Sequence, residues 1–167
     1  MPHSVMVRRA TPDDRAALGR LWQELMDFHG RLAPEAFALA DDALSSWLGW
    51  LDKLLEDENR VVLVAQSEEG LVGYTHGAVE ERPPVYRERR HGTICEICVT
   101  EDWRRRGLGR KLVGALLDWF RERGLTEVHV GAAACNPVSK TFWREVGFQP
   151  HTVQMRRSIE LPRGSAG

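Results

Sequence analysis

The sequence predicts an α/β (α+β) domain with a mixed, mostly antiparallel central sheet of six or seven strands, flanked by about four helices. Two observations predict this class. Apolar runs with strand and helix periods follow one another in the order β-α-α-β-β-β-α-β-α-β. The second half places a strand, a glycine turn, a helix and another strand in succession, which is typical of a parallel crossover. The 167 residues suit one domain, expected over 1–160, with a disordered tail at 161–167.

A short strand at 5–9 and two helices begin the chain. Thr11 is a suitable N-cap, Pro12 suits the first helical position, and Gly30 is expected to end this helix. A second helix is expected over 41–57. Large apolar residues recur every three or four positions in both segments, which indicates core packing. These residues are Leu18, Leu21, Leu25 and Phe28 in the first helix, and Leu44, Trp47, Leu48, Leu51, Leu54 and Leu55 in the second.

Two strands joined by a hairpin follow. The run 61–65 is continuously apolar and β-branched, as in a strand that is covered on both faces. A turn at 67–70 leads into a strand at 71–80. The segment 81–90 contains two prolines and many charges. A connection of this length either covers an active site or is a solvated loop, and the sequence leaves both open.

The second half continues with a strand at 93–100 and a helix that ends at Arg123 and Gly124. The buried stripe of this helix is expected at Leu108, Leu112, Leu116 and Phe120. A strand at 127–132 follows. A helix then begins at Asn136 and Pro137, with Val138, Phe142 and Val146 expected to face inward. Alternation of Val153, Met155 and Ile159 predicts a final strand.

The stretch 99–112, which reads VTEDWRRRGLGRKL, has the composition of an anion site. A strand ends, a glycine turn follows, and a helix begins at once, so free backbone N–H groups and the positive end of the helix dipole converge. Gly107 and Gly109 have no Cβ, which allows a diphosphate to approach the backbone. Five cationic side chains surround the turn: Arg104, Arg105, Arg106, Arg110 and Lys111.

Two other glycine motifs are excluded at this turn. A dinucleotide-binding fingerprint requires Gly or Ala three residues after Gly109, where Leu112 stands. A P-loop requires Gly-Lys-Ser/Thr four residues after a glycine, and no such sequence follows. An ordinary helix start with a solvated basic face remains the alternative when the turn is considered alone.

The order Arg104-x-x-Gly107-x-Gly109 resembles the acetyl-coenzyme A motif of the GNAT (Gcn5-related N-acetyltransferase) superfamily. The resemblance extends to 136–148, NPVSKTFWREVGF, which is similar to a later block of the same family. Together the two blocks cover about 93–150. This resemblance implies a GNAT fold, whose sheet is splayed in the middle, and acetyl-CoA as the acyl donor.

The resemblance also implies where the cofactor binds. The pantetheine arm would pair with backbone groups of Cys98, Val99 and Thr100, in the manner of an added strand. The diphosphate would lie against the residues from Arg104 to Lys111, Leu108 included. Asn136 matches the family asparagine that contacts the pantetheine arm, and Phe142 and Trp143 are candidate cofactor contacts. No metal is expected.

Glu96 is the candidate general base. An amine must lose its proton before it can attack a thioester, so the reaction needs a base and a donor to the oxyanion, for which a backbone N–H near Val99 is suitable. Glu96 is the carboxylate within an otherwise apolar strand, and burial raises a carboxyl pKa toward the useful range. A structural Glu paired with an Arg is the alternative. His76, Glu80 and His91 are reserve candidates.

One departure concerns the acid that protonates the leaving thiolate. Many members place a Tyr seven residues after the family asparagine, and Trp143 stands there. An indole N–H is not a practical acid, so that role does not carry over. Tyr74 is a candidate acid in its place, with Tyr86 or water as alternatives. In the family the first two helices form one wall of the acceptor groove, so Phe37, Trp47 and Trp50 either line a pocket or pack the core.

Composition bounds the remaining classes. The formal net charge of −1 and the lack of aromatic residues among the arginines argue against a nucleic-acid partner. No apolar run reaches membrane-spanning length, and the first ten residues lack the apolar region of a signal peptide. Three cysteines without a secretory signal predict reduced thiols in the cytoplasm. Cys95-x-x-Cys98 lies in a strand and lacks further ligands at metal-site spacing.

These observations together predict an enzyme. The expected reaction is transfer of an acetyl group from acetyl-CoA to a primary amine of a small molecule or peptide, within a ternary complex. The alternative is a regulatory module that binds acyl-CoA with little catalysis, which Trp143 motivates. A homodimer that pairs the final strands is a further expectation.

Overall fold

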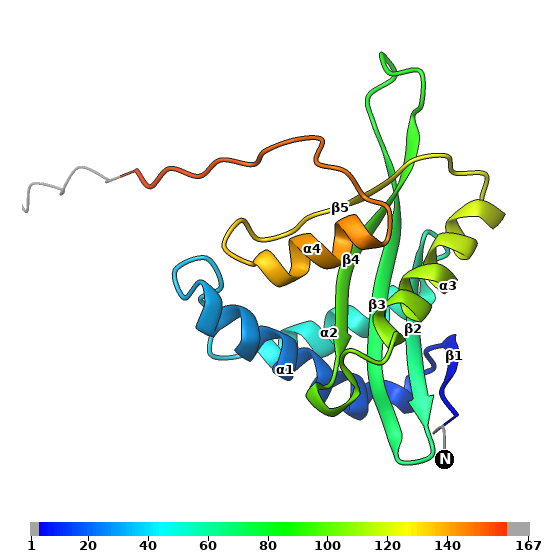
Figure 1. Ribbon diagram of the computed structural model, residues 1–167, viewed down its shortest axis with the longest axis vertical. Helices are drawn as coiled ribbons and strands as arrows, with labels where there is room; N and C mark the ends of the chain where they lie inside the picture. The colour runs from blue at the N-terminus through cyan, green and yellow to red at the C-terminus, as the bar shows by residue number, and fades with distance from the viewer. Residues whose placement is uncertain (1–3, 160–167) are drawn as a thin grey trace, which may run out of the picture.

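Five strands form one sheet in the order β1-β2-β3-β4-β5, and four helices flank it (Figure 1), in the residues 4–159 that this computed structural model describes. Strands β1 to β4 are antiparallel neighbours, and β5 is parallel to β4. The mixed sheet with one parallel crossover through α3 is therefore confirmed. The strands are β1 (Met6–Arg9), β2 (Arg60–Ser67), β3 (Gly70–Glu81), β4 (Arg90–Val99) and β5 (Val128–Val130). The helices are α1 (Arg15–Leu32), α2 (Ala43–Glu56), α3 (Leu108–Glu122) and α4 (Pro137–Glu145).

The expected strand count of six or seven is wrong, because the described residues form five strands. The alternating residues Val153, Met155 and Ile159 lie in no strand, and each is more than four-fifths exposed. Alternation predicts a strand only where a neighbouring strand supplies hydrogen bonds and a core covers one face. Neither is present at 149–159 in the described structure. The expected tail at 161–167 lies outside the described residues.

Two helix details also differ from expectation. Helix α1 continues past Gly30 to Leu32, because Gly30 does not adopt the left-handed backbone that ends a helix. In α4, Val138 is 72% exposed and Trp143 is buried instead. The apolar side of this short helix is therefore centred on Phe142, Trp143 and Val146, which belong to the core under α3.

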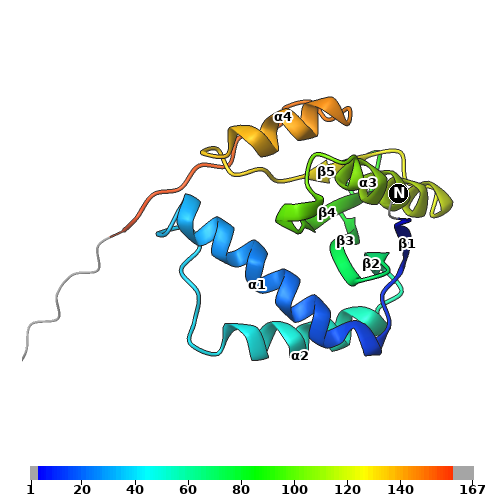
Figure 2. The same cartoon turned by 60° about the horizontal axis from the view of Figure 1, so that its bottom comes forward.

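The sheet separates two apolar cores. Helices α1 and α2 cover one face, and α3 and α4 lie on the opposite side of the sheet (Figure 2). The expected stripe of α3 is confirmed, since Leu108, Leu112, Leu116 and Phe120 are all buried. Strand β2 is buried on both faces from Val61 to Ala65, also as expected.

Two glycines allow α3 to lie close to the sheet. A Cβ on Gly77 in β3 would stand 2.5 Å from Leu116 Cδ1, and a Cβ on Gly92 in β4 would stand 2.8 Å from the Phe120 ring. Both distances are shorter than the contacts that real Cβ atoms make. The stripe of α3 therefore fits the sheet because these two positions carry no side chain.

Candidate functional site

A β-bulge in β4 turns Glu96 toward α2. The register pairs His76 with Glu96 but Gly77 with Ile94, so Cys95 is an extra residue in β4. Ile94 belongs to the core on the α3 side, and Cys98 belongs to the core on the α1–α2 side. In a regular strand, residues 94, 96 and 98 would share one face. The bulge thus moves Glu96 to the face that α1 and α2 cover.

Glu96 is a half-buried carboxylate held by two side chains of β3. The Tyr74 hydroxyl donates a hydrogen bond of 2.9 Å to Glu96 Oε2, and the Thr75 hydroxyl donates one of 2.8 Å to the Glu96 carbonyl. Burial raises the pKa of Glu96 above its ordinary value, while Tyr74 and the Trp47 indole act in the opposite direction. Such a carboxylate can accept a proton near neutral pH more readily than an exposed one.

Tyr74 has no solvent exposure and remains protonated. Burial raises its pKa well above 10, and the neighbouring Glu96 carboxylate acts in the same direction. Its hydroxyl proton is directed at Glu96. The structure therefore places the candidate acid beside the candidate base, as one hydrogen-bonded pair.

One edge of β4 is open beside Glu96. Strand β5 pairs with β4 only from Gly92 to Ile94, whereas β3 pairs along β4 as far as Val99. Within the described sheet, residues 95–99 therefore have no strand on the β5 side. An extended ligand can add to such an edge through backbone hydrogen bonds. The expected cofactor positions Cys98 and Val99 lie on this stretch, and Thr100 follows it.

Some of these groups already have partners. Cys98 is buried, and its thiol lies 3.4 Å from the Leu21 carbonyl. The Val99 carbonyl accepts a 2.9 Å hydrogen bond from Arg104 Nε, and the Thr100 N–H donates to the Val72 carbonyl at 3.0 Å. A cofactor contact at the Thr100 N–H would have to displace its existing bond, whereas the Val99 carbonyl can accept a second hydrogen bond.

The glycine turn provides a cradle of backbone N–H groups. Gly107 is the N-cap of α3 with a left-handed φ of 78°, and no side chain caps this helix. The first hydrogen bond of the helix runs from the Lys111 N–H to the Gly107 carbonyl, so the N–H groups of Leu108, Gly109 and Arg110 are free of helical partners. A Cβ on Gly107 would meet nothing within 4 Å. Open space in front of free N–H groups fits a diphosphate.

Gly109 and Leu108 have further structural roles. A Cβ on Gly109 would stand 3.2 Å from the Phe142 ring, so this glycine also allows α4 to pack against α3. The Leu108 side chain is buried in the core, which leaves its N–H as the group that faces the cradle. Arg105 has a left-handed φ of 62°. Left-handed residues within such turns are typical of backbone concavities that bind anions.

The five cations around the cradle are differently engaged. Arg104 pairs with Glu24 at 3.2 Å, and Arg110 pairs with Glu145 at 2.7 Å. Lys111 Nζ donates to the Val5 carbonyl, and Arg106 lies over the Trp103 ring. Arg105 has no side-chain partner among residues 4–159. Arg105 and Arg106 are thus the cations best able to turn toward an anion.

The second sequence block packs against the cradle from α4. Asn136 Oδ1 accepts a 3.0 Å hydrogen bond from the Ser139 N–H and so caps α4, which leaves the side-chain NH₂ as the group for a ligand. Trp143 is 6% exposed and packs edge-to-face on Phe142 and Phe148. The structure therefore gives the Trp143 ring a place in the core.

The aromatic residues of the first two helices divide between core and surface. Trp47 is buried and stacks on Trp22. Trp50 is 39% exposed and contacts His76 edge-on, with 5.3 Å between ring centroids. Phe37 stacks on His29 at 4.5 Å. Trp50 thus lies on the same side of the sheet as Glu96 and reaches solvent.

The reserve candidates do not all gather at Glu96. His76 is directly opposite Glu96 in the register. Glu80 and His91 are cross-strand partners four residues further along β3, which is about 13 Å away. There His91 packs on the His129 ring at 4.5 Å and lies 3.6 Å from Glu80. These two residues belong to a separate polar cluster.

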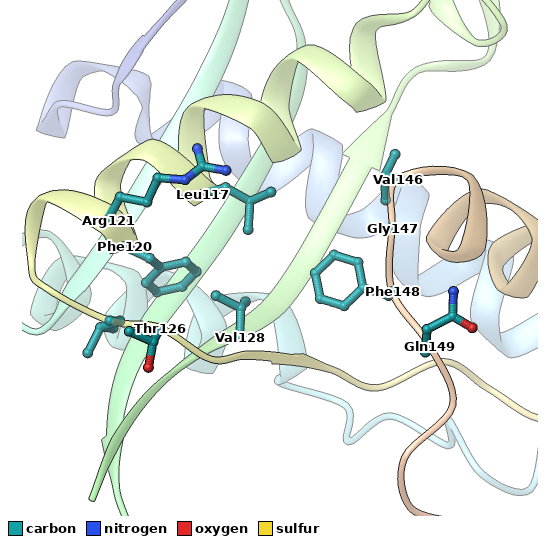
Figure 3. Close-up of a pocket in the computed structure, with 10 residues that line it drawn as sticks. Leu117, Phe120, Arg121, Thr126, Val128, Val146, Gly147, Phe148 and Gln149 are labelled. Atoms are coloured by element: carbon teal, nitrogen blue, oxygen red, sulfur yellow. The ribbon is translucent and has the colours of Figure 1, made fainter. Parts of the chain in front are cut away.

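A pocket of about 410 Å³ lies on the other side of the sheet (Figure 3). Its lining includes Leu117, Phe120, Val128 and Phe148, and Arg121 is its charged member. Phe120 belongs to the α3-side core, whereas Glu96 faces α2, so this pocket is separate from the candidate site. Among residues 4–159, no three His, Cys, Asp or Glu side chains are grouped to hold a metal ion. Within the same residues, no helix is both long and apolar enough to span a membrane.

Comparison with known protein families shows which family this chain, with its cradle and open strand edge, belongs to. The model of the acetyltransferase (GNAT) family matches residues 20–148, which is most of the chain. The chain belongs to the GNAT acetyltransferase family. Acetyl-CoA is the acyl donor of this family, and the free N–H groups at the start of α3, within the expected stretch from Arg104 to Lys111, are of the kind that suits its diphosphate.

Solved structures share the GNAT fold. A mutant of protein BH1408 from Bacillus halodurans has 20% identity and a TM-score of 0.84, with 93% of this chain and 99% of that chain covered. A transcriptional regulator from Bacillus halodurans C-125 has 20% identity and a TM-score of 0.77, covering 93% and 100%. Aminoglycoside N-acetyltransferase AAC(6')-Iy in complex with CoA has 17% identity and a TM-score of 0.74, covering 95% and 97%. A search of curated protein sequences finds no match.

The pairing of Tyr74 with Glu96 was missed at the level of sequence. The two residues are 22 positions apart, and their contact depends on the β3–β4 register and on the bulge at Cys95. A strand pattern gives the face of a residue only while the alternation is unbroken. The available signal was the spacing of Tyr74 and His76, which puts both on one face of β3.

Proposed function

We propose that this GNAT protein is an N-acetyltransferase that moves an acetyl group from acetyl-CoA to a primary amine while both are bound. The observation that carries this proposal is the position of Glu96. It is a half-buried carboxylate on the bulge of β4, beside the open strand edge and a short stretch of chain before the cradle. Acetyl-CoA supplies an activated thioester carbonyl.

Glu96 takes the proton of the acceptor amine. A protonated amine has no lone pair, so a base must act before or during attack. Burial raises the pKa of Glu96, which makes the carboxylate a better base, and the bond from Tyr74 fixes its orientation. A backbone N–H on the open edge near Val99 is the donor for the developing oxyanion. The leaving thiolate takes its proton from Glu96, which by then carries the amine proton, or from water, because the buried Tyr74 hydroxyl donates to Glu96 and its raised pKa makes it a weaker acid.

The acceptor is a small molecule or peptide with a primary amine. The segment 15–59, which contains α1 and α2, carries nine Asp and Glu but four Lys and Arg, so its field attracts cations. One protein of the same fold is an aminoglycoside N-acetyltransferase, which supports a small-molecule acceptor. The half-exposed Trp50 offers an aromatic surface on this side.

The second candidate function is an acyl-CoA-binding regulatory module. Two observations favour it: Trp143 occupies the position of the expected tyrosine acid, and one protein of the same fold is a transcriptional regulator. Such a module would bind CoA through the same cradle and would release no thiol.

Thiol release from acetyl-CoA separates the two candidates. The assay uses sisomicin, spermidine and a tripeptide with a free N-terminus as acceptors, and calorimetry with CoA measures cofactor binding. The enzyme is expected to release CoA with at least one acceptor. Glu96→Gln should lower the rate most below the pKa of the amine, while Glu101→Gln on the exposed turn should not. Tight CoA binding with no turnover on any amine would favour the regulatory module.

A further inference from the structure

His76 is a second side chain of β3 that faces Glu96. Tyr74 and His76 are two residues apart and lie on one face of the strand, and His76 is the direct cross-strand partner of Glu96. Directly opposed residues have Cβ atoms about 5 Å apart. Tyr74 already binds one oxygen of the carboxylate, Oε2. His76 is therefore the nearest β3 neighbour for the other oxygen.

His76 is buried without hydrogen-bond partners. Its side chain is 1% exposed, Trp50 packs edge-on against its ring, and neither Nδ1 nor Nε2 has a partner among residues 4–159. A buried polar group without a partner costs free energy, so each such group in a native protein calls for an explanation, of which a catalytic role is one. Catalytic hydrogen bonds are often open in free enzymes and close when substrates bind.

We propose that His76 is a positioning residue for Glu96, whose ring N–H donates to Glu96 Oε1 when the site is loaded. This inference rests on the proposed function of Glu96 as the base. Two uncharged donors from β3, Tyr74 and His76, then hold the two carboxylate oxygens. The edge-on contact with Trp50 restricts rotation of the His76 ring.

The charge state of His76 suits this role. Burial lowers the pKa of His76 to about 4, and the positive charge of Arg60 acts in the same direction. The ring is therefore neutral at physiological pH and does not repel a cationic acceptor. Other charged or titratable groups surround His76 and Glu96. They are Arg60 from β2, Tyr74 from β3, and Cys95 and Cys98 from β4. Glu24 from α1 acts on Cys98.

The test measures the ionisation of Glu96 itself. Carbon-13 NMR of the Glu96 carboxyl in the CoA-bound protein gives its pKa in the parent, in His76→Phe and in His76→Gln. Phe retains the ring volume without nitrogen, and Gln restores an N–H. The pKa of Glu96 should rise by about one unit in His76→Phe, a tenfold change in the ionisation constant, and return toward the parent value in His76→Gln. Equal pKa values in the parent and His76→Phe would overturn the proposal.

Two further measurements test the role of His76 independently of the carbon-13 titration. If His76→Phe does not fold, nitrogen-15 shifts of the His76 ring in the parent protein must respond as Glu96 ionises, and ring shifts that stay constant would overturn the role. With an active acceptor, the pH at which kcat/KM rises should increase in His76→Phe, with an unchanged KM for acetyl-CoA. Failure of every acceptor would remove the proposed function, whereas the NMR titration would still decide the positioning role.

Discussion

The Tyr74 hydroxyl lies 2.9 Å from Glu96 Oε2, which joins two neighbouring strands through their functional side chains. Tyr74 packs edge-on against Trp47, so its hydroxyl has little freedom to turn away. A donor fixed in this way stabilises the ionised carboxylate more than the neutral acid. The orientation and the basicity of Glu96 thus depend on a tyrosine in β3 as well as on the bulge in β4.

Tyr74→Phe should raise the pKa of Glu96. The change removes the donated hydrogen bond and retains the ring in the core, so burial then raises the carboxyl pKa with less opposition. Because the base must be ionised, the pH at which kcat/KM rises should move upward by about one unit. The measurement is a pH–rate profile with an acceptor amine.

Tyr86→Phe is the matched control. Tyr86 is 52% exposed and lies in the loop between β3 and β4, far along the hairpin from Glu96. Its profile should superimpose on that of the parent protein. If the profiles of Tyr74→Phe and Tyr86→Phe coincide, Tyr74 has no influence on the base.

The sequence predicted the cradle more completely than the base. The glycines, the helix start and the buried stripe of α3 depend on neighbours along the chain, and the structure retains all of them. The environment of Glu96 depends instead on pairing between strands and on one extra residue, Cys95. The prediction of a final strand was wrong for the same reason, since a strand also depends on pairing. The alternating residues at 153–159 have no neighbouring strand to pair with in the described structure.

Gly107→Asp should strongly weaken CoA binding while the fold persists. The left-handed φ of 78° disfavours any side chain, and the new carboxylate would point into the space where a diphosphate meets the N–H groups. Affinity should fall by at least about tenfold, equivalent to roughly 1.4 kcal/mol. Isothermal calorimetry with CoA measures it.

Gly30→Asp adds the same charge elsewhere. Gly30 is in α1, where a Cβ would meet nothing within 4 Å. This variant should bind CoA like the parent protein. Unchanged affinity in Gly107→Asp, with circular dichroism equal to the parent, would place the diphosphate away from the turn.

Gly77→Ala should destabilise the protein. The added methyl group would overlap Leu116 Cδ1 at 2.5 Å and crowd Phe120, so α3 must shift from the sheet. Overpacking of this kind costs about 1–3 kcal/mol. Gly49→Ala in α2 is the comparison, because a Cβ there meets nothing within 4 Å, and it should stabilise by about 1 kcal/mol. Urea unfolding measures both, and a neutral Gly77→Ala would show that α3 does not require the close approach.

Asp14→Asn should lower the free energy of unfolding at neutral pH. It should also make the free energy of unfolding less dependent on pH in the acidic range. Asp14 receives two bonds from Arg8, at 2.7 and 2.8 Å, and one of 2.8 Å from the Thr11 N–H. The bond from Arg8 lowers the pKa of Asp14 from 3.8 to about 2. The folded state therefore holds the ionised form more strongly than the unfolded chain does. Its contribution, about 2 kcal/mol, is present above pH 4 and is lost as the pH falls toward 2.

Unfolding in urea at pH 7 and pH 3 checks this prediction. Asp14→Asn should lose about 2 kcal/mol at pH 7 and clearly less at pH 3, where the parent has already lost part of the contribution. Asp52→Asn is the control, because Asp52 pairs with Arg15 on the surface, with about half of each side chain exposed. An exposed pair contributes at most about 1 kcal/mol. If the two variants lose the same stability at both pH values, the pair between Arg8 and Asp14 contributes no more to the free energy of unfolding than an exposed ion pair does.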